Sequence, residues 1–246
     1  MEIKEGRIFT GSFDLDKWLN GGYETDIITT IYGPAGSGKT NFCISAAVSA
    51  CKEKKVIFID TEGGFSIERF KQIAGESYKS FLSNLLILKP TSFSEQKKDF
   101  SLLLKNINEG NIGLIIVDGM TMLYRLELAD ACNSSDEFRI RLTNKELAKQ
   151  LRILSEIARK KNIPILITNQ IYYDFLSKED FQNGKEKKAN MVGGDLLKYW
   201  SKCLIELQNN NGKRKALLVK HRNIPEGEFA FSIGNSGIKR RGIFEF

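Results

Sequence analysis

The sequence predicts an α/β fold: a mostly parallel central sheet, helices on both faces and an antiparallel β extension at the carboxyl end. Over the first 170 residues, short β-branched apolar runs alternate with amphipathic runs, which is typical of parallel strands joined by crossover helices. Later residues form short strand-like runs separated by Asn- and Gly-rich turns. A glycine-rich loop, GPAGSGKT, separates the first long strand from the first long helix.

The expected parallel strands are five short apolar segments. They are residues 26–32, 55–60, 84–89, 112–119 and 163–170. Strands this apolar are typical of a sheet that is covered on both faces.

The segments between these strands have helical spacing or helix-end signals. We expect helices over residues 39–53, 66–75, 94–110 and 136–161. Ser66 can cap the second helix and Gly75 can end it. Leu147, Leu151 and Leu154 form the apolar stripe of the last one.

The pattern changes after residue 170. Residues 171–190 are polar and lysine-rich without a steady period, so we expect a mobile loop there. Short strands are expected at 203–208, 215–220, 228–233 and 237–246. We find no repeat, low-complexity tract or linker, and we expect residues 1–246 to form a single domain.

Composition excludes several classes of protein. The chain has 246 residues, 41% of them hydrophobic and 27% charged, with a formal charge of +7. No apolar run approaches the roughly 20 residues that a membrane span needs, and the first residues lack a signal-peptide core. The four scattered cysteines form no CxxC pair and indicate reduced thiols, hence a cytoplasmic protein. A single histidine argues against histidine-rich metal sites and a Ser-His-Asp triad.

The glycine-rich loop matches the phosphate-binding pattern GxxxxGK[ST] between a strand and a helix. Its glycines let backbone N–H groups surround phosphate oxygens, and the positive end of the helix dipole adds attraction. We expect Lys39 to reach the β- and γ-phosphates and Thr40 to bind Mg²⁺. The expected nucleotide-binding residues are Gly33, Pro34, Ala35, Gly36, Ser37, Gly38, Lys39, Thr40 and Asn41.

Two carboxylates follow neighbouring strands. Asp118 ends the fourth strand, and we expect it to hold Mg²⁺ through water, although an ordinary strand-end aspartate would only cap a turn. Glu62 follows the second strand and could polarise the water that attacks the γ-phosphate. A guanine-reading N/TKxD pattern is not found: Asn144 and Lys145 have no aspartate at the required place. The expected ligand is therefore ATP with Mg²⁺.

Four segments in this order resemble the core of the RecA/RadA recombinase family. They are residues 9–42, 58–70, 114–119 and 167–171. Within the family, the chain is most similar to the short archaeal paralogues of RadA, because of its size, a core that starts near residue 1, and the tail segment KHRNIPEGEFAF.

The resemblance implies roles for further residues. Glu62 matches the family's catalytic glutamate, and Gln170 matches a glutamine that senses the γ-phosphate and connects to the DNA-binding loop. Arg69 matches an arginine that stacks near adenine, and Pro225 lies where RadA places a proline near a neighbour's ATP. Without the family, Gln170 would be an ordinary polar loop residue and Arg69 a solvated helix residue.

The expected DNA contacts fall in loops and in the carboxyl-terminal strands. Residues 125–137 occupy the place of one DNA-binding loop but are acidic; residues 171–190 occupy another and carry Tyr172, Tyr173, Lys185, Lys187 and Lys188. The second could equally be a solvated loop. Basic residues of the tail would share a face if the hairpins form, or would instead protect a sheet edge. They are Lys213, Arg214, Lys215, Lys220, His221, Arg222, Lys239, Arg240 and Arg241.

The resemblance implies an ATP-binding, weakly hydrolysing accessory protein of DNA repair and recombination. It would bind DNA without sequence preference and assist a RadA-type recombinase or a Holliday-junction resolvase. RadA has a helix-hairpin-helix domain and a phenylalanine-containing segment for which there is no room before Gly11, which argues against RadA-like filaments. The alternatives are a self-sufficient filament-forming recombinase and a signalling ATPase of the circadian-clock-protein type that acts on proteins.

Overall fold

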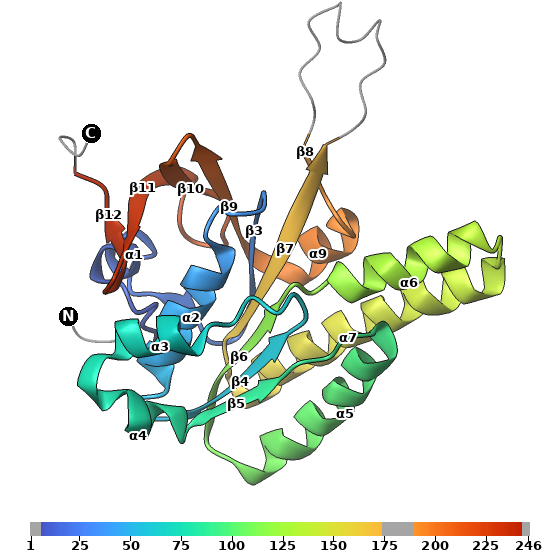
Figure 1. The fold of residues 1–246 in the computed structure, drawn as a ribbon, viewed down its shortest axis with the longest axis horizontal. Coiled ribbons are helices and arrows are strands. Elements are labelled where there is room, and N and C mark those ends of the chain that lie inside the picture. The colour runs from blue at the N-terminus through green and yellow to red at the C-terminus, as the bar shows by residue number, and fades with distance from the viewer. Residues whose placement is uncertain (1–5, 174–188, 243–246) are drawn as a thin grey trace, which may run out of the picture.

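A computed structural model describes residues 6–173 and 189–242 (Figure 1). In this part of the chain most strands join one ten-stranded sheet, in the order β12-β11-β10-β9-β3-β7-β6-β4-β5, with β8 paired to β7. The strands are β3 (Ile28–Gly33), β4 (Lys55–Asp60), β5 (Leu85–Leu88), β6 (Ile112–Asp118), β7 (Ile165–Tyr173), β8 (Ala189–Met191), β9 (Ser201–Asn210), β10 (Lys213–Lys220), β11 (Gly227–Gly234) and β12 (Gly237–Arg240).

The sheet has a parallel and an antiparallel part. β5, β4, β6, β7, β3 and β9 pair with one another in parallel. β10, β11 and β12 continue from β9 as antiparallel strands, and β8 is antiparallel to β7. The predicted α/β class with a carboxyl-terminal antiparallel extension is confirmed. The hairpin between β9 and β10 turns at Asn211 and Gly212, both with positive φ, as an Asn-Gly turn requires.

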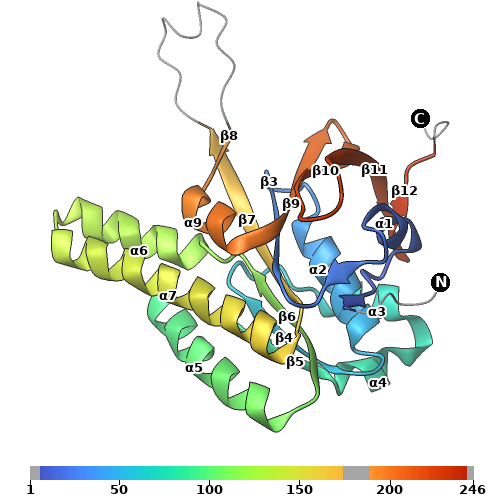
Figure 2. The ribbon, with the colours of Figure 1, turned by 180° about the vertical axis from the view of Figure 1, so that it is seen from behind.

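Helices cover both faces of the sheet (Figures 1 and 2). One face carries α1 (Phe13–Trp18), α2 (Lys39–Ala50), α3 (Ile67–Ala74) and α4 (Tyr78–Leu82). The other carries α5 (Phe93–Glu109), α6 (Met122–Asn133), α7 (Glu137–Lys161) and α9 (Gly194–Trp200). A small sheet of β1 (Arg7–Ile8) and β2 (Tyr23–Glu24) lies outside the main one.

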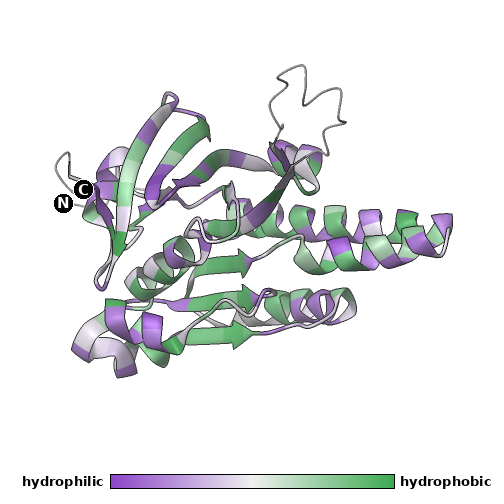
Figure 3. Cartoon of the chain, turned by 45° about the horizontal axis from the view of Figure 1, so that its top comes forward, coloured by the Kyte–Doolittle hydropathy of each residue, from purple (hydrophilic) through white to green (hydrophobic). Residues whose placement is uncertain are grey.

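Strand alternation divides the apolar residues between two cores. On β4, Val56 and Phe58 pack with α2, while Ile57 and Ile59 pack with the helices of the other face, as the two-residue period of a strand dictates. In Figure 3 the central parallel strands are accordingly mostly hydrophobic, whereas the helices alternate between hydrophobic and hydrophilic residues.

Residues 125–137 are not a loop, and this expectation was wrong. They form most of α6, the turn after it and the start of α7. The two helices form a hairpin that projects beyond the sheet (Figure 1). Leu123, Tyr124 and Ala131 are buried on α6, and Arg139 pairs with Glu127 across the hairpin at 2.9 Å. The acidic residues of this segment therefore belong to a packed helical hairpin.

Other boundaries also differ. β7 continues through Tyr173, three residues past its expected end, and β8 pairs with this extension. Most of the expected loop at 171–190 lies outside the described residues. The last expected strand ends at Arg240, and residues 243–246 also lie outside the described part. Within the described ranges, we find no helix with the length and apolar character to cross a membrane.

Candidate active site

The glycine-rich loop joins β3 to α2 at the carboxyl edge of the sheet. Gly38 is the residue before α2 and has φ 110°; a Cβ there would lie 2.8 Å from Ile233 Cδ1. Only glycine satisfies both conditions without movement. The loop opens on a cavity of about 420 Å³, lined by Ala35, Gly36, Gly38, Lys39, Thr40, Asn41, Glu62, Gln170, Arg214 and Ile233.

Lys39 is held by the loop that it follows. Its Nζ donates to the carbonyl oxygens of Gly33 and Pro34, both at 2.9 Å. Burial lowers the pKa of this ammonium, against the opposing effect of Glu62 and Asp118. A buried cation with two neutral partners is suited to exchange one of them for a phosphate oxygen.

The side chains of Asp118 and Thr40 are in contact at the first turn of α2. The Thr40 hydroxyl donates to Asp118 Oδ2 at 2.7 Å, and the Thr168 hydroxyl donates to Asp118 Oδ1 at 2.5 Å. Burial raises the pKa of Asp118 to about 6, although both hydroxyls oppose the shift.

These oxygens fit a magnesium ion that also binds phosphate. Mg²⁺ commonly takes one or two carboxylates, waters and phosphate oxygens rather than a complete protein cage. In the described part of the chain, no group of three or more His, Cys, Asp or Glu side chains could hold a metal ion. Thr40 and Asp118 therefore fit as partial ligands that a nucleotide would complete.

Glu62 and Gln170 are joined directly. Gln170 Nε2 donates to Glu62 Oε2 at 2.9 Å, and Gln170 lies opposite Gly33 in the register of β7 and β3. Asp60 fixes the turn that carries Glu62, because its carboxylate accepts the backbone N–H groups of Gly64 and Phe65, both at 3.0 Å. The pair links the end of β7 to the turn after β4, beside the phosphate-binding loop.

We expect Gly119→Ala to reduce ATP turnover because it displaces Glu62. Gly119 has φ 90°, and a Cβ there would lie 2.4 Å from Thr61 Oγ1 and 2.6 Å from Glu62 Cγ. Strain of this kind costs about 1–3 kcal/mol, which urea denaturation can measure beside kcat. Gly75→Ala is the control, since Gly75 has φ 62° but open space around it. Equal kcat in both variants would contradict the displacement.

Arg69 connects the start of α2 with the β11–β12 turn. Its Nε donates to Asn41 Oδ1 at 2.8 Å and one Nη donates to the carbonyl of Gly234 at 2.8 Å. Burial lowers the pKa of the guanidinium. The structure thus brings Arg69 and Asn41 together beside the phosphate-binding loop, and the stacking of Arg69 on adenine stays a prediction.

The basic residues predicted to contact DNA do not share one face. Lys213 is exposed, whereas Arg214 lines the cavity above the phosphate-binding loop. Lys220 donates to the carbonyls of Lys198 and Ser201.

The other predicted DNA contacts are also divided. Arg222 forms two hydrogen bonds with Asp26, at 2.6 and 2.8 Å. Arg240 lies over the ring of Phe229 at 5.8 Å. Lys185, Lys187 and Lys188 fall outside the described residues. Lys213 and Arg214 are adjacent on β10 and therefore lie on opposite sides of the sheet, and any DNA contact of these residues stays a prediction.

Two site residues were missed from the sequence: Asp60 and Thr168, which orient Glu62 and Asp118. Arg214 was expected to contact DNA, but it lines the nucleotide cavity. The alternation of residues along β10 indicates the side on which Arg214 lies, because Ala216 and Leu218 lie on the same side of the strand and are apolar. No local pattern marked Asp60 or Thr168.

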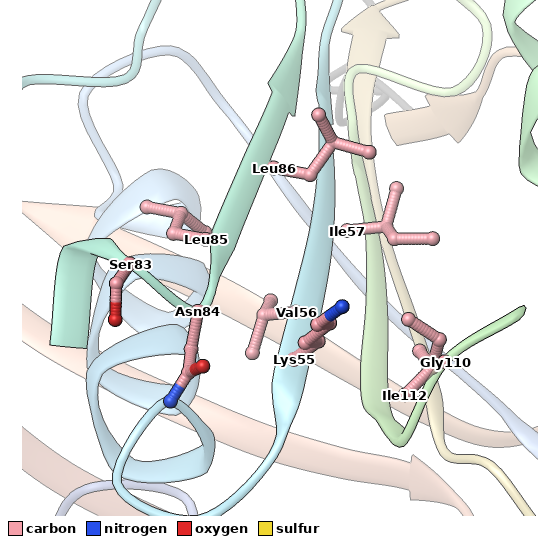
Figure 4. Close-up of a pocket in the computed structure, with 9 residues that line it drawn as sticks. All are labelled: Lys55, Val56, Ile57, Ser83, Asn84, Leu85, Leu86, Gly110 and Ile112. Carbon is pink, nitrogen blue, oxygen red and sulfur yellow. The ribbon is translucent and has the colours of Figure 1, made fainter. Parts of the chain in front are cut away.

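A second hollow lies at the opposite edge of the sheet, where β4, β5 and β6 begin (Figure 4). Lys55, Asn84 and Ile112 are among its walls. The polar residues of the nucleotide site gather instead at the carboxyl ends of the strands, where ligands of open α/β sheets bind.

Comparison with known proteins agrees with this geometry. The family model of Rad51 matches residues 4–241. The chain belongs to the Rad51 family. The resemblance to RecA/RadA recombinases is thereby confirmed.

Within the Rad51 family, the chain groups with the archaeal RadB paralogues. A "DNA repair and recombination protein RadB" of Methanococcus maripaludis is 44% identical over 92% of this chain and 97% of its own length. Proteins of the same name are 43% identical in Methanocaldococcus jannaschii, over 92% of this chain and 98% of theirs, and 41% in Methanococcoides burtonii, over 96% and 99%.

Proposed function

We propose that this Rad51-family chain is an ATP-binding, weakly hydrolysing accessory protein of DNA repair and homologous recombination. The observation that carries the proposal is the cavity that joins Lys39, Thr40, Glu62 and Gln170 at the end of β3. The names of the similar proteins support the setting in repair and recombination. Residues 1–246 would act as a single RecA-like ATPase core.

The residues of the site have complementary roles. The amides of the phosphate-binding loop and the Lys39 ammonium would hold the phosphate chain, and Thr40 with Asp118 would hold Mg²⁺. When bound, Mg²⁺ supplies charge neutralisation on the phosphate oxygens. Glu62 would orient the attacking water and accept its proton.

We expect turnover to be slow. The Glu62 carboxylate is hydrogen-bonded to Gln170, so that contact must rearrange or be shared before Glu62 can hold a water. Gln170 lies on β7, and residues 174–188, which include Lys185 and Lys187, follow this strand in the sequence. DNA bound without sequence preference is the ligand that we propose there.

The partners that we propose are a RadA-type recombinase and a Holliday-junction resolvase. Lys213, Lys220, Arg222 and Arg240 remain candidates for phosphate contact, now as separate positions and not as one face. Such contacts would weaken steeply with salt.

The test measures ATP turnover with and without single-stranded DNA, together with Glu62→Gln. We expect slow wild-type turnover that DNA changes little. Glu62→Gln should lower kcat by about 10²- to 10⁴-fold while the Kd for ATP stays within a few-fold. Glu68→Gln is the control, because Glu68 is exposed on the neighbouring helix α3.

The outcomes separate the proposed roles. Unchanged kcat in Glu62→Gln would remove Glu62 from catalysis. Strong stimulation by DNA would contradict the accessory role and favour a self-sufficient recombinase. Turnover that ignores DNA, with no retardation of any DNA at low salt, would favour an ATPase that acts on proteins.

A further inference from the structure

Arg214 faces the nucleotide cavity from the antiparallel part of the sheet. On β10, Ala216 and Leu218 are buried in the core shared with α2, and strand alternation places Arg214 on the same side. Arg214 pairs in register with Phe231 of β11, which is also buried on that side. The cavity lined by Lys39 and Glu62 is consequently also lined by Arg214.

The Arg214 side chain carries an unsatisfied donor. Its Nε is buried and has no hydrogen-bond partner. Buried donors are nearly always paired, and leaving one unpaired is costly. A donor of this kind that borders a phosphate-binding loop is explained by a ligand that supplies the acceptor.

Neighbouring contacts hold Arg214 near the loop. Asn209, opposite Arg214 on β9, extends its Nδ2 to within 3.4 Å of the Gly36 carbonyl. Ile233 of β11 lines the same cavity and approaches Gly38. Arg214 therefore lies on a strand whose two neighbours, β9 and β11, both approach the phosphate-binding loop.

We propose that Arg214 is a phosphate-binding residue of the ATP site and acts from within the same chain. Its guanidinium donates to oxygens of the triphosphate in the cavity that it lines together with Lys39 and Thr40. The planar fork of an arginine suits two phosphate oxygens at once. This inference rests on the proposed ATP binding. Arg214 joins Lys39 as a second positively charged residue that contacts the phosphates. Bound nucleotide thereby connects the antiparallel strands to the phosphate-binding loop.

The test compares Arg214→Met with the wild type by titration calorimetry, using ATP with Mg²⁺. Methionine keeps much of the apolar stem and removes the donors. We expect the Kd to rise about tenfold or more, as the loss of a charge-assisted hydrogen bond implies. Lys52→Met is the control, since Lys52 also carries a positive charge but is exposed just beyond the far end of α2; its Kd should not change.

Thermal unfolding supplies a readout that does not depend on activity. Without nucleotide, Arg214→Met should unfold at a temperature no lower than the wild type, because the unpaired Nε is gone. With ATP, its rise in Tm should be smaller than that of the wild type. Arg214→Lys keeps a cation and should recover only part of the affinity; it also serves as the binding test if Arg214→Met does not fold.

The two possible failures are distinguishable. If the wild type does not bind ATP, the proposed function is wrong. If the wild type binds ATP, and Arg214→Met or, failing that, Arg214→Lys binds with the same Kd, the proposed function stands and the role of Arg214 is overturned.

Discussion

Lys39→Ala should lower the affinity for ATP with Mg²⁺ by about 100-fold or more. Lys39 is 7% exposed, and its ammonium lies within hydrogen-bond distance of two carbonyls of the loop. A phosphate oxygen that replaces one of these carbonyls forms a charge-assisted bond in a partly desolvated site, where such bonds are strongest. Alanine removes this bond and the countercharge for the phosphate chain.

Titration calorimetry or a fluorescent ATP analogue measures the change. Lys52→Ala is the control, because Lys52 lies just beyond the other end of α2 and is exposed. Both variants remove one positive charge, so a general electrostatic effect would weaken binding equally. Wild-type affinity in Lys39→Ala would exclude the glycine-rich loop as the phosphate site.

The parallel strands were predictable because their sequence signal is local and strong. Residues 55–60 and 112–119 are apolar almost throughout, and burial on both faces requires this. The glycine-rich loop was predictable for a similar reason, since its residues must follow one another in order to surround a phosphate. Glu62 was indicated by its place just after the second strand and Gln170 by the family resemblance, and the structure brings both side chains to one cavity.

The helix at Met122–Asn133 was not predictable from the same signals. Its buried residues Leu123, Tyr124 and Ala131 are few and face the partner helix α7, whereas Leu126 is exposed. Stability of this segment comes from tertiary packing, which overrides weak local patterning. The expectation of a loop came from the family resemblance, which implied a DNA-binding loop at this place, and not from a signal in these residues.

The side on which a residue lies required the strand register. Arg214 was grouped with Lys213 and Lys215 from proximity in sequence, but adjacent residues of a strand point to opposite sides. Asp60 was missed for a related reason. It accepts hydrogen bonds from the backbone of Gly64 and Phe65 within a turn whose shape no sequence motif predicts.

Phe42→Ala should destabilise the protein by about 3–5 kcal/mol, the usual cost of emptying a buried aromatic site. Phe42 lies on α2 and is fully buried. Its ring meets that of Phe231 on β11 edge to face, with centroids 5.2 Å apart. The substitution therefore removes core volume and an aromatic pair that joins the helix of the phosphate-binding loop to the antiparallel strands.

Urea denaturation of Phe42→Ala and Phe13→Ala measures this effect against an exposed phenylalanine. Phe13 is 68% exposed on α1, and its replacement should change the free energy of unfolding by about 0.5 kcal/mol or less. If the contact between Phe42 and Phe231 also positions Arg214 and Ile233 beside the phosphate-binding loop, Phe42→Ala should weaken ATP binding under conditions where the variant is still folded. A large loss of stability with unchanged ATP affinity would mean that the antiparallel strands support the fold without shaping the nucleotide site.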